Sequence, residues 1–343
     1  MTDRRTNPPR DARTKLGVIE TRPRRRARPV GQDLIGQVVL ERYLVEAELG
    51  SGAMGTVYRG RHVKLARDVA IKVLHGELVH DRTMRARFQR EAAAAARLHH
   101  ANVSGVLDVG TSAVGHQLMV MDLVEGVPLR DLMIGPLPRA RTINFVRQIL
   151  RGLDHAHGAG LVHRDLKPDN VIVERDGHGG EVPRIVDFGI AVLRGDDALT
   201  GGKLTETGAM IGTPLYMAPE QARGETVDHR ADLFALGVMM FEMMTGVTPF
   251  DGSPLEVVIA NMNEDLPAIA ARAPDVVPDP VLERFLRRLA ARDRERRFAT
   301  AHEALEIVDL VERDPDDAEL RLGRIDVERA LAVVCLPSYS RGR

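Results

Sequence analysis

Two hydrophobic patterns divide the chain. Between about residues 40 and 122, short apolar runs end at glycines and polar turns, which is typical of β-strands. We expect these strands at residues 42–49, 56–58, 68–74, 103–109 and 117–122. Later apolar residues recur at helical spacing, which predicts helices at residues 139–158, 232–245, 254–263, 280–291 and 301–311. The sequence therefore predicts a small sheet-rich lobe followed by a larger helical lobe.

The two ends of the chain lack such a pattern. Residues 1–37 are rich in Arg, Pro and Thr and contain a basic run at 22–28, so we expect a disordered, solvated segment. Contact of this segment with an acidic partner or nucleic acid is the alternative. Residues 313–343 are charged and weakly helical, without a recognisable module. One folded domain is therefore expected at 38–312, with its lobes meeting near residue 125.

The composition narrows the class of protein. Of 343 residues, 44% are hydrophobic and 28% charged, which is typical of a globular protein. A formal net charge of -1 argues against a generally basic nucleic-acid binder. A single cysteine, Cys335, excludes a disulfide within the chain and indicates a reducing compartment. No apolar run is long enough to span a membrane and no secretory signal is evident, so a cytoplasmic location is expected.

A glycine-rich segment at 50–55 lies between the first two expected strands. Its Gly-x-Gly-x-x-Gly pattern also occurs in dinucleotide-binding folds, which need a helix after the third glycine. Here Thr56, Val57 and Tyr58 follow, and β-branched and aromatic residues favour a second strand. The segment is therefore expected to form the tip of a hairpin, where small residues let the backbone approach phosphates.

A polar loop at 161–173 stands between an apolar pair and a β-branched run. It contains His163, Arg164 and Asp165, and Asn170 follows five residues after Asp165. Alone, such a loop is as often a solvated connection as a site. Its meaning depends on the other segments and their order.

In order and spacing, seven segments resemble the protein kinases over about residues 40 to 312, and more closely the eukaryotic-like (Hanks-type) bacterial serine/threonine protein kinases. They are the glycine-rich loop, the strand with Lys72, the helix with Glu91, the His-Arg-Asp loop, the triplet Asp187-Phe188-Gly189, and the segments 212–220 and 293–298. The resemblance implies an α+β, bilobal protein-kinase-like fold. Its N lobe (about 38–125) would be a small antiparallel sheet with one helix, and its C lobe (about 126–312) would be larger and mainly helical.

The resemblance also implies the catalytic roles. Asp165 would accept the proton of the substrate hydroxyl, and Lys167 would contact the γ-phosphate. Lys72 would hold the α- and β-phosphates. Glu91 lies on the buried stripe of its helix, where a carboxylate needs a cation, and Lys72 is the expected partner. Pairing of Glu91 with a neighbouring surface arginine is the alternative.

ATP and Mg²⁺ are the implied cofactors, with Mn²⁺ as a substitute. Asn170 and Asp187 would hold the metal, since Mg²⁺ takes few protein oxygens and completes its shell with phosphate and water. Met121 would border the adenine pocket as the gatekeeper, and 122–124 would be the hinge. The implied nucleotide contacts are Gly50, Ser51, Gly52, Ala53, Met54, Gly55, Val57, Ala70, Lys72, Met121, Asp122 and Val124.

Regulation is implied for the segment 190–211. Arg164 precedes the catalytic aspartate and needs an anion, which phosphorylated Thr205 or Thr207 would supply after autophosphorylation in a transient homodimer. Thr213 would pack beside Asp165, and with Lys167 it indicates serine/threonine specificity toward protein substrates.

Further pairs are implied by the same resemblance. Asp232 would anchor the catalytic loop from a buried helix, and Arg297 would pair with Glu220. Two other classes stay open: a catalytically silent pseudokinase scaffold and a small-molecule phosphotransferase. The former typically lacks the lysine, the catalytic aspartate or the metal aspartate, and the latter would not be expected to carry the segment 213–220.

Overall fold

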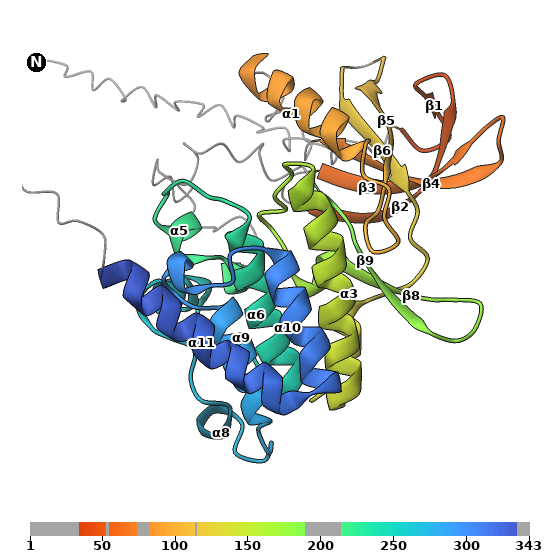
Figure 1. Ribbon diagram of the computed structural model, residues 1–343. Coiled ribbons are helices and arrows are strands. Elements are labelled where there is room, and N and C mark those ends of the chain that lie inside the picture. The colour runs from red at the N-terminus through yellow and green to blue at the C-terminus, as the bar shows by residue number, and fades with distance from the viewer. Residues whose placement is uncertain (1–33, 53–54, 75–81, 114, 189–213, 335–343) are drawn as a thin grey trace, which may run out of the picture.

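The computed structural model describes residues 34–52, 55–74, 82–113, 115–188 and 214–334. They form two lobes, a smaller one built on a sheet and a larger one built from helices (Figure 1). The two lobes meet at the segment after residue 122, which agrees with the expected bilobal fold. Among the helices of these residues, none combines the length and apolar character that crossing a membrane requires.

The N lobe is a six-stranded antiparallel sheet with one helix on a face. The strand order is β1-β2-β3-β4-β6-β5. The helix α1 contributes Phe88, Ala92 and Ala95 to a core that also contains Ala70 and Met119. The elements are β1 (Val38–Val39), β2 (Tyr43–Gly52), β3 (Gly55–His62), β4 (Arg67–Leu74), α1 (Arg82–Ala95), β5 (Val106–Thr111) and β6 (Gln117–Asp122).

The C lobe surrounds one buried helix, α6. Every residue of α6 after Arg230 is buried, which explains why its sequence is apolar on all sides. Gly237 allows close packing, since a Cβ there would lie 2.7 Å from Ala290. The helices are α2 (Leu129–Leu132), α3 (Arg139–Gly158), α5 (Pro219–Ala222), α6 (Arg230–Thr245), α7 (Pro254–Asn263), α8 (Ile269–Arg272), α9 (Pro280–Leu289), α10 (Ala301–Arg313) and α11 (Pro315–Val334).

A small three-stranded sheet of β7 (Val127–Pro128), β8 (Val171–Arg175) and β9 (Glu181–Ile185) lies next to α3 (Figure 1). Strands β8 and β9 form the hairpin expected around the turn 176–180. The Asp176 carboxylate accepts hydrogen bonds from the backbone N–H groups of His178 (2.9 Å) and Gly180 (2.6 Å), which stabilises the turn. The catalytic loop precedes β8 and Asp187 follows β9, and because Val171 pairs with Ile185, both lie at the same end of this hairpin.

The two lobes meet at a second place besides the hinge. The loop after α1 pairs with β9, because Ser104 N–H donates to Ile185 O (2.8 Å) and Ile185 N–H donates to Asn102 O (2.9 Å). The Asn102 side chain also donates to Pro183 O at 2.9 Å. The strand that leads to Asp187 is thereby fixed to the N lobe.

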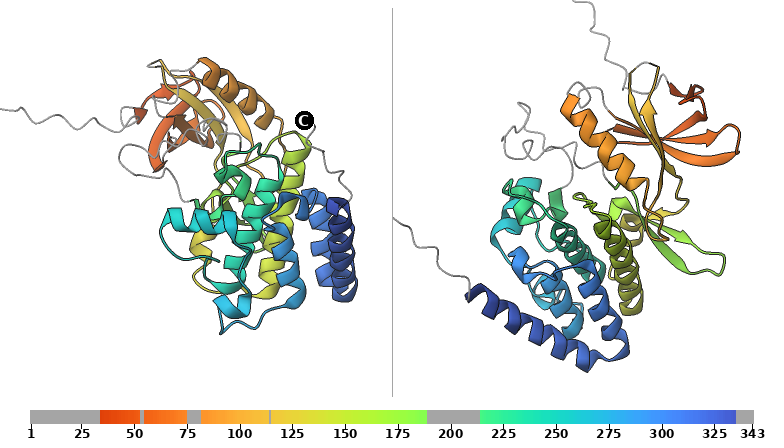
Figure 2. Two further views of the ribbon diagram at one scale, coloured as in Figure 1. Left: turned by 90° about the vertical axis from the view of Figure 1, so that its left-hand side faces the viewer. Right: turned by 45° about the horizontal axis from the view of Figure 1, so that its top comes forward.

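The C-terminal segment differs from the expectation. Helix α11 occupies much of the segment 313–343, and its Ala318 and Leu322 are fully buried against the C lobe. Both views in Figure 2 show α11 lying along the outside of the helical lobe. The packed lobe therefore extends past the boundary expected at residue 312. This packing was not expected from the sequence, because charged residues surround the buried Ala318 and Leu322.

Candidate active site

The catalytic loop is held from below by Asp232 in the first turn of α6. Its carboxylate accepts hydrogen bonds from the backbone N–H groups of His163 and Arg164, each at 2.8 Å, and lies 2.8 Å from Nε2 of His157. Burial alone would raise the pKa of Asp232, but the bond with His157 and the nearby histidines lower it below its usual value. The expected anchoring of the loop by Asp232 is therefore confirmed. The contribution of His157 from α3 was not predicted.

Three of the predicted catalytic and metal residues meet within this loop. The ammonium of Lys167 donates to Oδ2 of Asp165 at 2.9 Å, and both side chains are partly exposed. Asn170, at the end of the short 3₁₀ turn Pro168–Asn170, donates through Nδ2 to the backbone O of Asp165 at 2.8 Å. Arg164 adopts φ 63°, a strained conformation that the bonds to Asp232 stabilise.

Asp187 follows β9 and faces the catalytic loop. Val186 N–H donates to Asn170 O at 2.9 Å, which joins the two segments. Asp187 itself has φ 67°. His163 is buried, and its Nε2 lies 2.9 Å from the backbone O of Val186. Its ring packs edge-on against the ring of Phe188, with 4.8 Å between the ring centroids. His163 thus positions Asp187 relative to Asp165, a role that the sequence did not indicate.

Lys72 reaches this group from the N lobe. Its Nζ donates to Oδ2 of Asp187 at 2.8 Å, and its side chain is only 8% exposed. The contact with Asp187 was not predicted from the sequence. Glu91 lies half-buried on α1, and its expected contact with Lys72 stays a prediction. A buried ammonium needs a close carboxylate, and in this structure Asp187 supplies one.

The glycine-rich segment forms the expected hairpin of β2 and β3. Gly52 pairs with Gly55, and Oγ of Ser51 lies 3.0 Å from Oγ1 of Thr56. A Cβ on Gly55 would lie 2.2 Å from the carbonyl oxygen of Val73, so glycine is required there by the contact with β4. Gly50 and Gly52 have open space at the Cβ position. Ala53 and Met54 lie outside the described residues.

The residues predicted around the adenine lie on neighbouring strands. Ala70 on β4 pairs with Met121 on β6, and both are buried. Val57 on β3 pairs with Lys72 on β4. The chain leaves the sheet after Asp122 and continues through Val124, which is partly buried. The predicted apolar contacts and Lys72, the lysine that is expected to bind phosphate, therefore lie on adjacent strands of one sheet.

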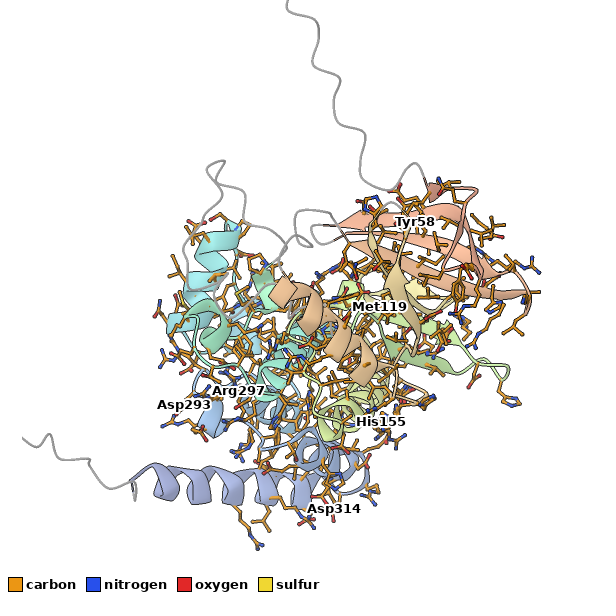
Figure 3. All side chains as sticks on the ribbon, turned by 90° about the horizontal axis from the view of Figure 1, so that it is seen from above. Tyr58, Met119, His155, Asp293, Arg297 and Asp314 are labelled. Atoms are coloured by element: carbon orange, nitrogen blue, oxygen red, sulfur yellow. The ribbon has the colours of Figure 1, made fainter. Side chains whose placement is uncertain are left out.

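The segment around Glu220, within the kinase-like segment 212–220, is fixed to the C lobe by a buried ion pair. Arg297 donates to both oxygens of Glu220, at 2.6 and 2.7 Å, and both side chains are almost fully buried. Figure 3 shows Arg297 within the C lobe, near Asp293. This confirms the predicted pair. Gln221 then donates to the carbonyl oxygen of Arg164 at 2.7 Å, which connects this segment to the catalytic loop.

A second network holds the same segment. The hydroxyl of Tyr216 donates to Oε2 of Glu242 at 2.5 Å, and Arg130 donates to Oε1 of Glu242 at 2.5 Å. Arg130 also bonds the Tyr216 hydroxyl. Burial and the neighbouring Glu242 carboxylate raise the pKa of Tyr216, so it stays a neutral donor. None of these residues was singled out from the sequence.

The predicted regulatory residues are only partly described. Arg164 is half-buried, and its Nε is buried without a hydrogen-bond partner among the described residues. Thr205, Thr207 and Thr213 lie outside the described residues, as does Gly189. The anion that Arg164 needs thus remains a prediction.

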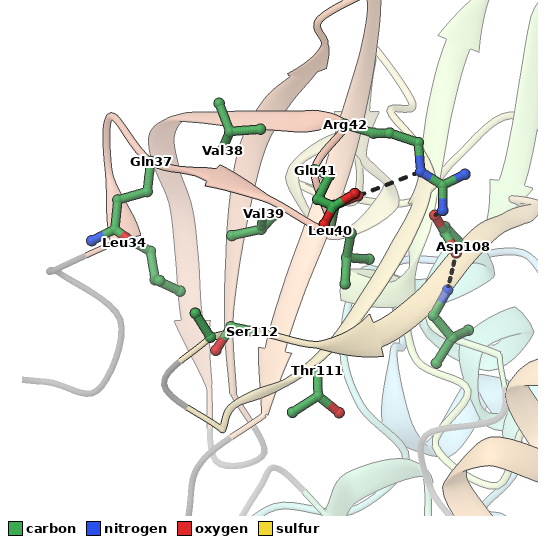
Figure 4. Close-up of a pocket in the computed structure, with 12 residues that line it drawn as sticks. Leu34, Gln37, Val38, Val39, Leu40, Glu41, Arg42, Asp108, Thr111 and Ser112 are labelled. Carbon is green, nitrogen blue, oxygen red and sulfur yellow. Dashed lines mark hydrogen bonds and ion pairs between the residues drawn. The ribbon is translucent and has the colours of Figure 1, made fainter.

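A cavity of about 420 Å³ in the N lobe lies apart from these residues. It is lined by the β1-β2 turn and by β5, with the ion pair between Arg42 and Asp108 (3.1 Å) at its wall (Figure 4). Its wall contains none of the catalytic or metal residues predicted from the sequence. The candidate active site is therefore the group around Asp165, Lys72 and Asp187.

Comparison with known proteins agrees with this geometry. The family described as "Protein kinase domain" matches residues 43–308. Serine/threonine-protein kinase pkn3 of Myxococcus xanthus is 39% identical, over 85% of this chain and 54% of that protein. Serine/threonine-protein kinase PknB of Mycolicibacterium smegmatis is 36% identical, over 89% of this chain and 48% of that protein. The chain thus spans about half the length of these curated relatives.

A solved structure shows the same fold. The crystal structure of the Mycobacterium tuberculosis PknI kinase domain is 31% identical with a TM-score of 0.62, and the match covers 80% of this chain and 97% of that chain. Fold, site geometry and sequence relatives lead to the same assignment. The chain belongs to the protein kinase domain family.

Proposed function

We propose that this protein transfers the γ-phosphoryl group of ATP to serine and threonine hydroxyls of other proteins. The observation that carries the proposal is a set of three contacts. Lys167 bonds Asp165 at 2.9 Å, and Lys72 bonds Asp187 at 2.8 Å. A hydrogen bond from Val186 N–H to Asn170 O connects the two segments that hold these pairs. The residues that we propose as proton acceptor, phosphate-binding cation and metal ligand thus lie on connected segments. Family membership and curated relatives named as serine/threonine-protein kinases support the same reaction.

Catalysis would rest on positioning and on charge. The transferred phosphoryl carries spread negative charge while the attacking and leaving oxygens lie roughly in line. Asp165 would orient the substrate hydroxyl and accept its proton. Lys167, held against Asp165, would place a positive charge beside the γ-phosphate. Lys72 would hold the α- and β-phosphates, with Glu91 as a second carboxylate able to orient it.

The donor atoms fit Mg²⁺. Asn170 uses its Nδ2 in the bond to Asp165, which leaves Oδ1 as the atom able to ligate a metal, and Asp187 supplies a carboxylate. The described residues hold no group of three or more His, Cys, Asp or Glu side chains that could bind a metal on their own. Two hard oxygen donors suit an ion that also takes phosphate and water, and Mn²⁺ would accept the same set. When bound, the metal neutralises charge on the phosphates.

Activation by autophosphorylation belongs to the same proposal. The half-buried guanidinium of Arg164 has a buried Nε without a hydrogen-bond partner in the described structure. A phosphothreonine offers three strong acceptor oxygens to such a group. Thr205 and Thr207 are the candidates, modified by a second copy of the chain in a transient dimer.

The alternatives are less well supported. A pseudokinase scaffold would not need Lys72, Asp165 and Asp187 together, and here they converge on one site. A small-molecule phosphotransferase would not need the segment near Glu220, which Arg297 fixes to the C lobe and Gln221 connects to the catalytic loop. That segment suits a platform for a protein substrate.

A peptide assay tests the proposal. The purified chain would be incubated with ATP, Mg²⁺ and matched peptides that differ only in a Ser, Thr or Tyr acceptor. We expect phosphorylation of the Ser and Thr peptides by the wild type and none by Asp165→Asn. Phosphorylation by Asp165→Asn at the wild-type rate would contradict the role of Asp165, and modification of the Tyr peptide alone would contradict the specificity.

A further inference from the structure

One carboxylate at the hinge is contacted from both lobes. Asp122 is the last residue of β6, and its Oδ1 accepts a hydrogen bond from Nη2 of Arg67 on β4 at 2.5 Å. Its Oδ2 lies 3.7 Å from Nη2 of Arg184 on β9 and accepts from Gly105 N–H at 3.2 Å. Arg67 orients the carboxylate within the N lobe, while Arg184 contacts it from the C lobe.

Arg184 contacts both places where the lobes meet. Besides the hinge residue Asp122, its guanidinium donates to the backbone O of Val103 at 3.3 Å, in the loop after α1. It also donates to Oε2 of Glu174 on β8 at 3.4 Å. One side chain of the C lobe is thus bonded to two separate segments of the N lobe.

The far end of the hinge is held in a related way. Oε1 of Glu174 accepts a hydrogen bond from the backbone N–H of Glu125 at 3.2 Å, and the Glu125 carboxylate lies 3.7 Å from Arg59 on β3. The hairpin of β8 and β9 lies beneath the N-lobe sheet in Figure 1, which agrees with these contacts. The hinge between residues 122 and 125 is therefore bonded at both ends to the same C-lobe hairpin.

These contacts are placed to resist rotation of one lobe against the other. Arg184 lies on β9 of the C lobe, while Asp122 ends β6 of the N lobe, so rotation between these two strands would lengthen their contact. The side chains of Asp122 and Arg184 are each only 21% exposed, so solvent screens their interaction less than that of a surface pair. A hinge strand of a few residues offers little resistance of its own.

We propose that Arg67, Asp122, Glu174 and Arg184 form an electrostatic latch that restrains the angle between the lobes. Its residues are positioning residues, since they lie on the hinge and its supports and not among Asp165, Lys72 and Asp187. The latch narrows the range of lobe arrangements from which ATP is bound. The inference concerns lobe motion and stands whether or not the proposed phosphotransfer is correct.

Measurement of the distance between the lobes tests the latch. Spin labels would be placed at Lys64→Cys in the exposed β3-β4 turn and at Ala270→Cys on α8, in a Cys335→Ala background. Pulsed electron spin resonance of the full chain then gives the distribution of distances. The variants are Asp122→Asn, Arg184→Gln and Arg184→Lys, each checked for folding by circular dichroism.

We expect Asp122→Asn and Arg184→Gln to broaden the distribution, with the population of more open arrangements rising about twofold to fivefold, the range that a partly exposed ion pair reaches. The double variant should broaden it by less than the sum of the two single effects, because both changes remove the contact between Asp122 and Arg184. Arg184→Lys should restore part of the narrow distribution. If either single variant does not fold, Arg67→Gln, on the exposed side of Asp122, should give a smaller broadening of the same kind.

Glu181→Gln is the matched control, because it breaks the ion pair between Arg141 and Glu181 (2.7 Å) on the same strand β9 but within the C lobe. It should leave the distribution unchanged. Unchanged distributions in the folded hinge variants would overturn the latch. Equal broadening by Glu181→Gln would overturn it as well, since general loosening of β9 would then explain the result.

Discussion

Nζ of Lys72 in the N lobe donates to Oδ2 of Asp187 in the C lobe at 2.8 Å. The cation expected to hold the nucleotide phosphates is thus bonded to the carboxylate expected to hold the metal. The pair connects the two lobes at the candidate site.

This contact predicts how nucleotide binding depends on metal. For the wild type, we expect Mg²⁺ to tighten the Kd for a non-hydrolysable ATP analogue, because Asp187 supplies a metal ligand. Asp187→Asn should bind the analogue equally well with Mg²⁺ or with EDTA, and it should lose turnover. Fluorescence titration under both conditions measures the difference.

Asp251→Asn serves as the control for metal dependence. Asp251 is an exposed carboxylate paired with Arg272 outside the site, so this variant should retain the wild-type response to Mg²⁺. If Asp187→Asn responded to Mg²⁺ as the wild type does, the assignment of Asp187 as a metal ligand would be wrong.

The buried pair of Glu220 and Arg297 predicts a large effect on stability. Glu220→Gln leaves the guanidinium of Arg297 buried without its counter-charge, so we expect the free energy of unfolding to fall by about 3–5 kcal/mol. Urea unfolding at pH 7 measures the change. The double variant Glu220→Gln with Arg297→Met should recover part of the loss, because it also removes the buried charge. A loss below about 1 kcal/mol, as for an exposed pair, would contradict the account.

The lowered pKa of Asp232 predicts that the stability of the fold depends on pH. Because its pKa in the folded protein is lowered below the unfolded value of about 3.9, the charged carboxylate stabilises the fold above that value. This contribution is lost as the pH falls through the folded pKa. We therefore expect Asp232→Asn to be less stable than the wild type at pH 7, and the difference to shrink as the pH falls below the unfolded value of about 3.9. Chemical unfolding at several pH values measures it.

Asp279→Asn is a matched control for Asp232. Asp279 caps α9 and pairs with Arg139 at 2.6 Å. Burial alone would raise the pKa of Asp279, but its hydrogen bond with Arg139 lowers this pKa below its usual value, as for Asp232. Its variant should show the same kind of pH-dependent loss of stability but keep its activity, since Asp279 is remote from the loop. Asp232→Asn should also lose activity, because the N–H groups of His163 and Arg164 lose a charged acceptor. Full activity of Asp232→Asn would argue against the anchoring role.

If a phosphothreonine binds Arg164 as we propose, replacing Thr205 and Thr207 should lower the activity. The double variant Thr205→Ala with Thr207→Ala should lower activity about 10-fold to 100-fold, the scale of one or two hydrogen bonds to a charged group. Phosphopeptide mapping of the wild type should find one or both threonines modified. Full activity of the double variant, with neither threonine phosphorylated in the wild type, would remove this part of the proposal.

The sequence predicted contacts that depend on the order of segments and missed those that depend on exact distances. Glu220 with Arg297, and Asp232 beneath the catalytic loop, followed from the family resemblance, because their positions in the fold leave few other partners. Lys72 was different, because the sequence indicated Glu91 as its partner and did not indicate its contact with Asp187. That contact depends on how closely the strand β4 of the N lobe lies to the residue after β9 of the C lobe.

Other parts of the site could not be predicted for a related reason. Arg184 and Glu174 sit in an ordinary hairpin by sequence, and their relation to the hinge appears only when that hairpin packs beneath the N lobe. His157 is one of several histidines, and its bond to Asp232 joins residues 75 positions apart. Such contacts depend on the packing of distant elements, which no local pattern records.

The most direct test of the central claim is the transfer of label from γ-labelled ATP with Mg²⁺, for the wild type beside Asp165→Asn, followed by phosphoamino-acid analysis. The account predicts phosphoserine or phosphothreonine from the wild type and none from Asp165→Asn, although both should bind nucleotide. Phosphotyrosine alone, or equal labelling by the two proteins, would contradict it.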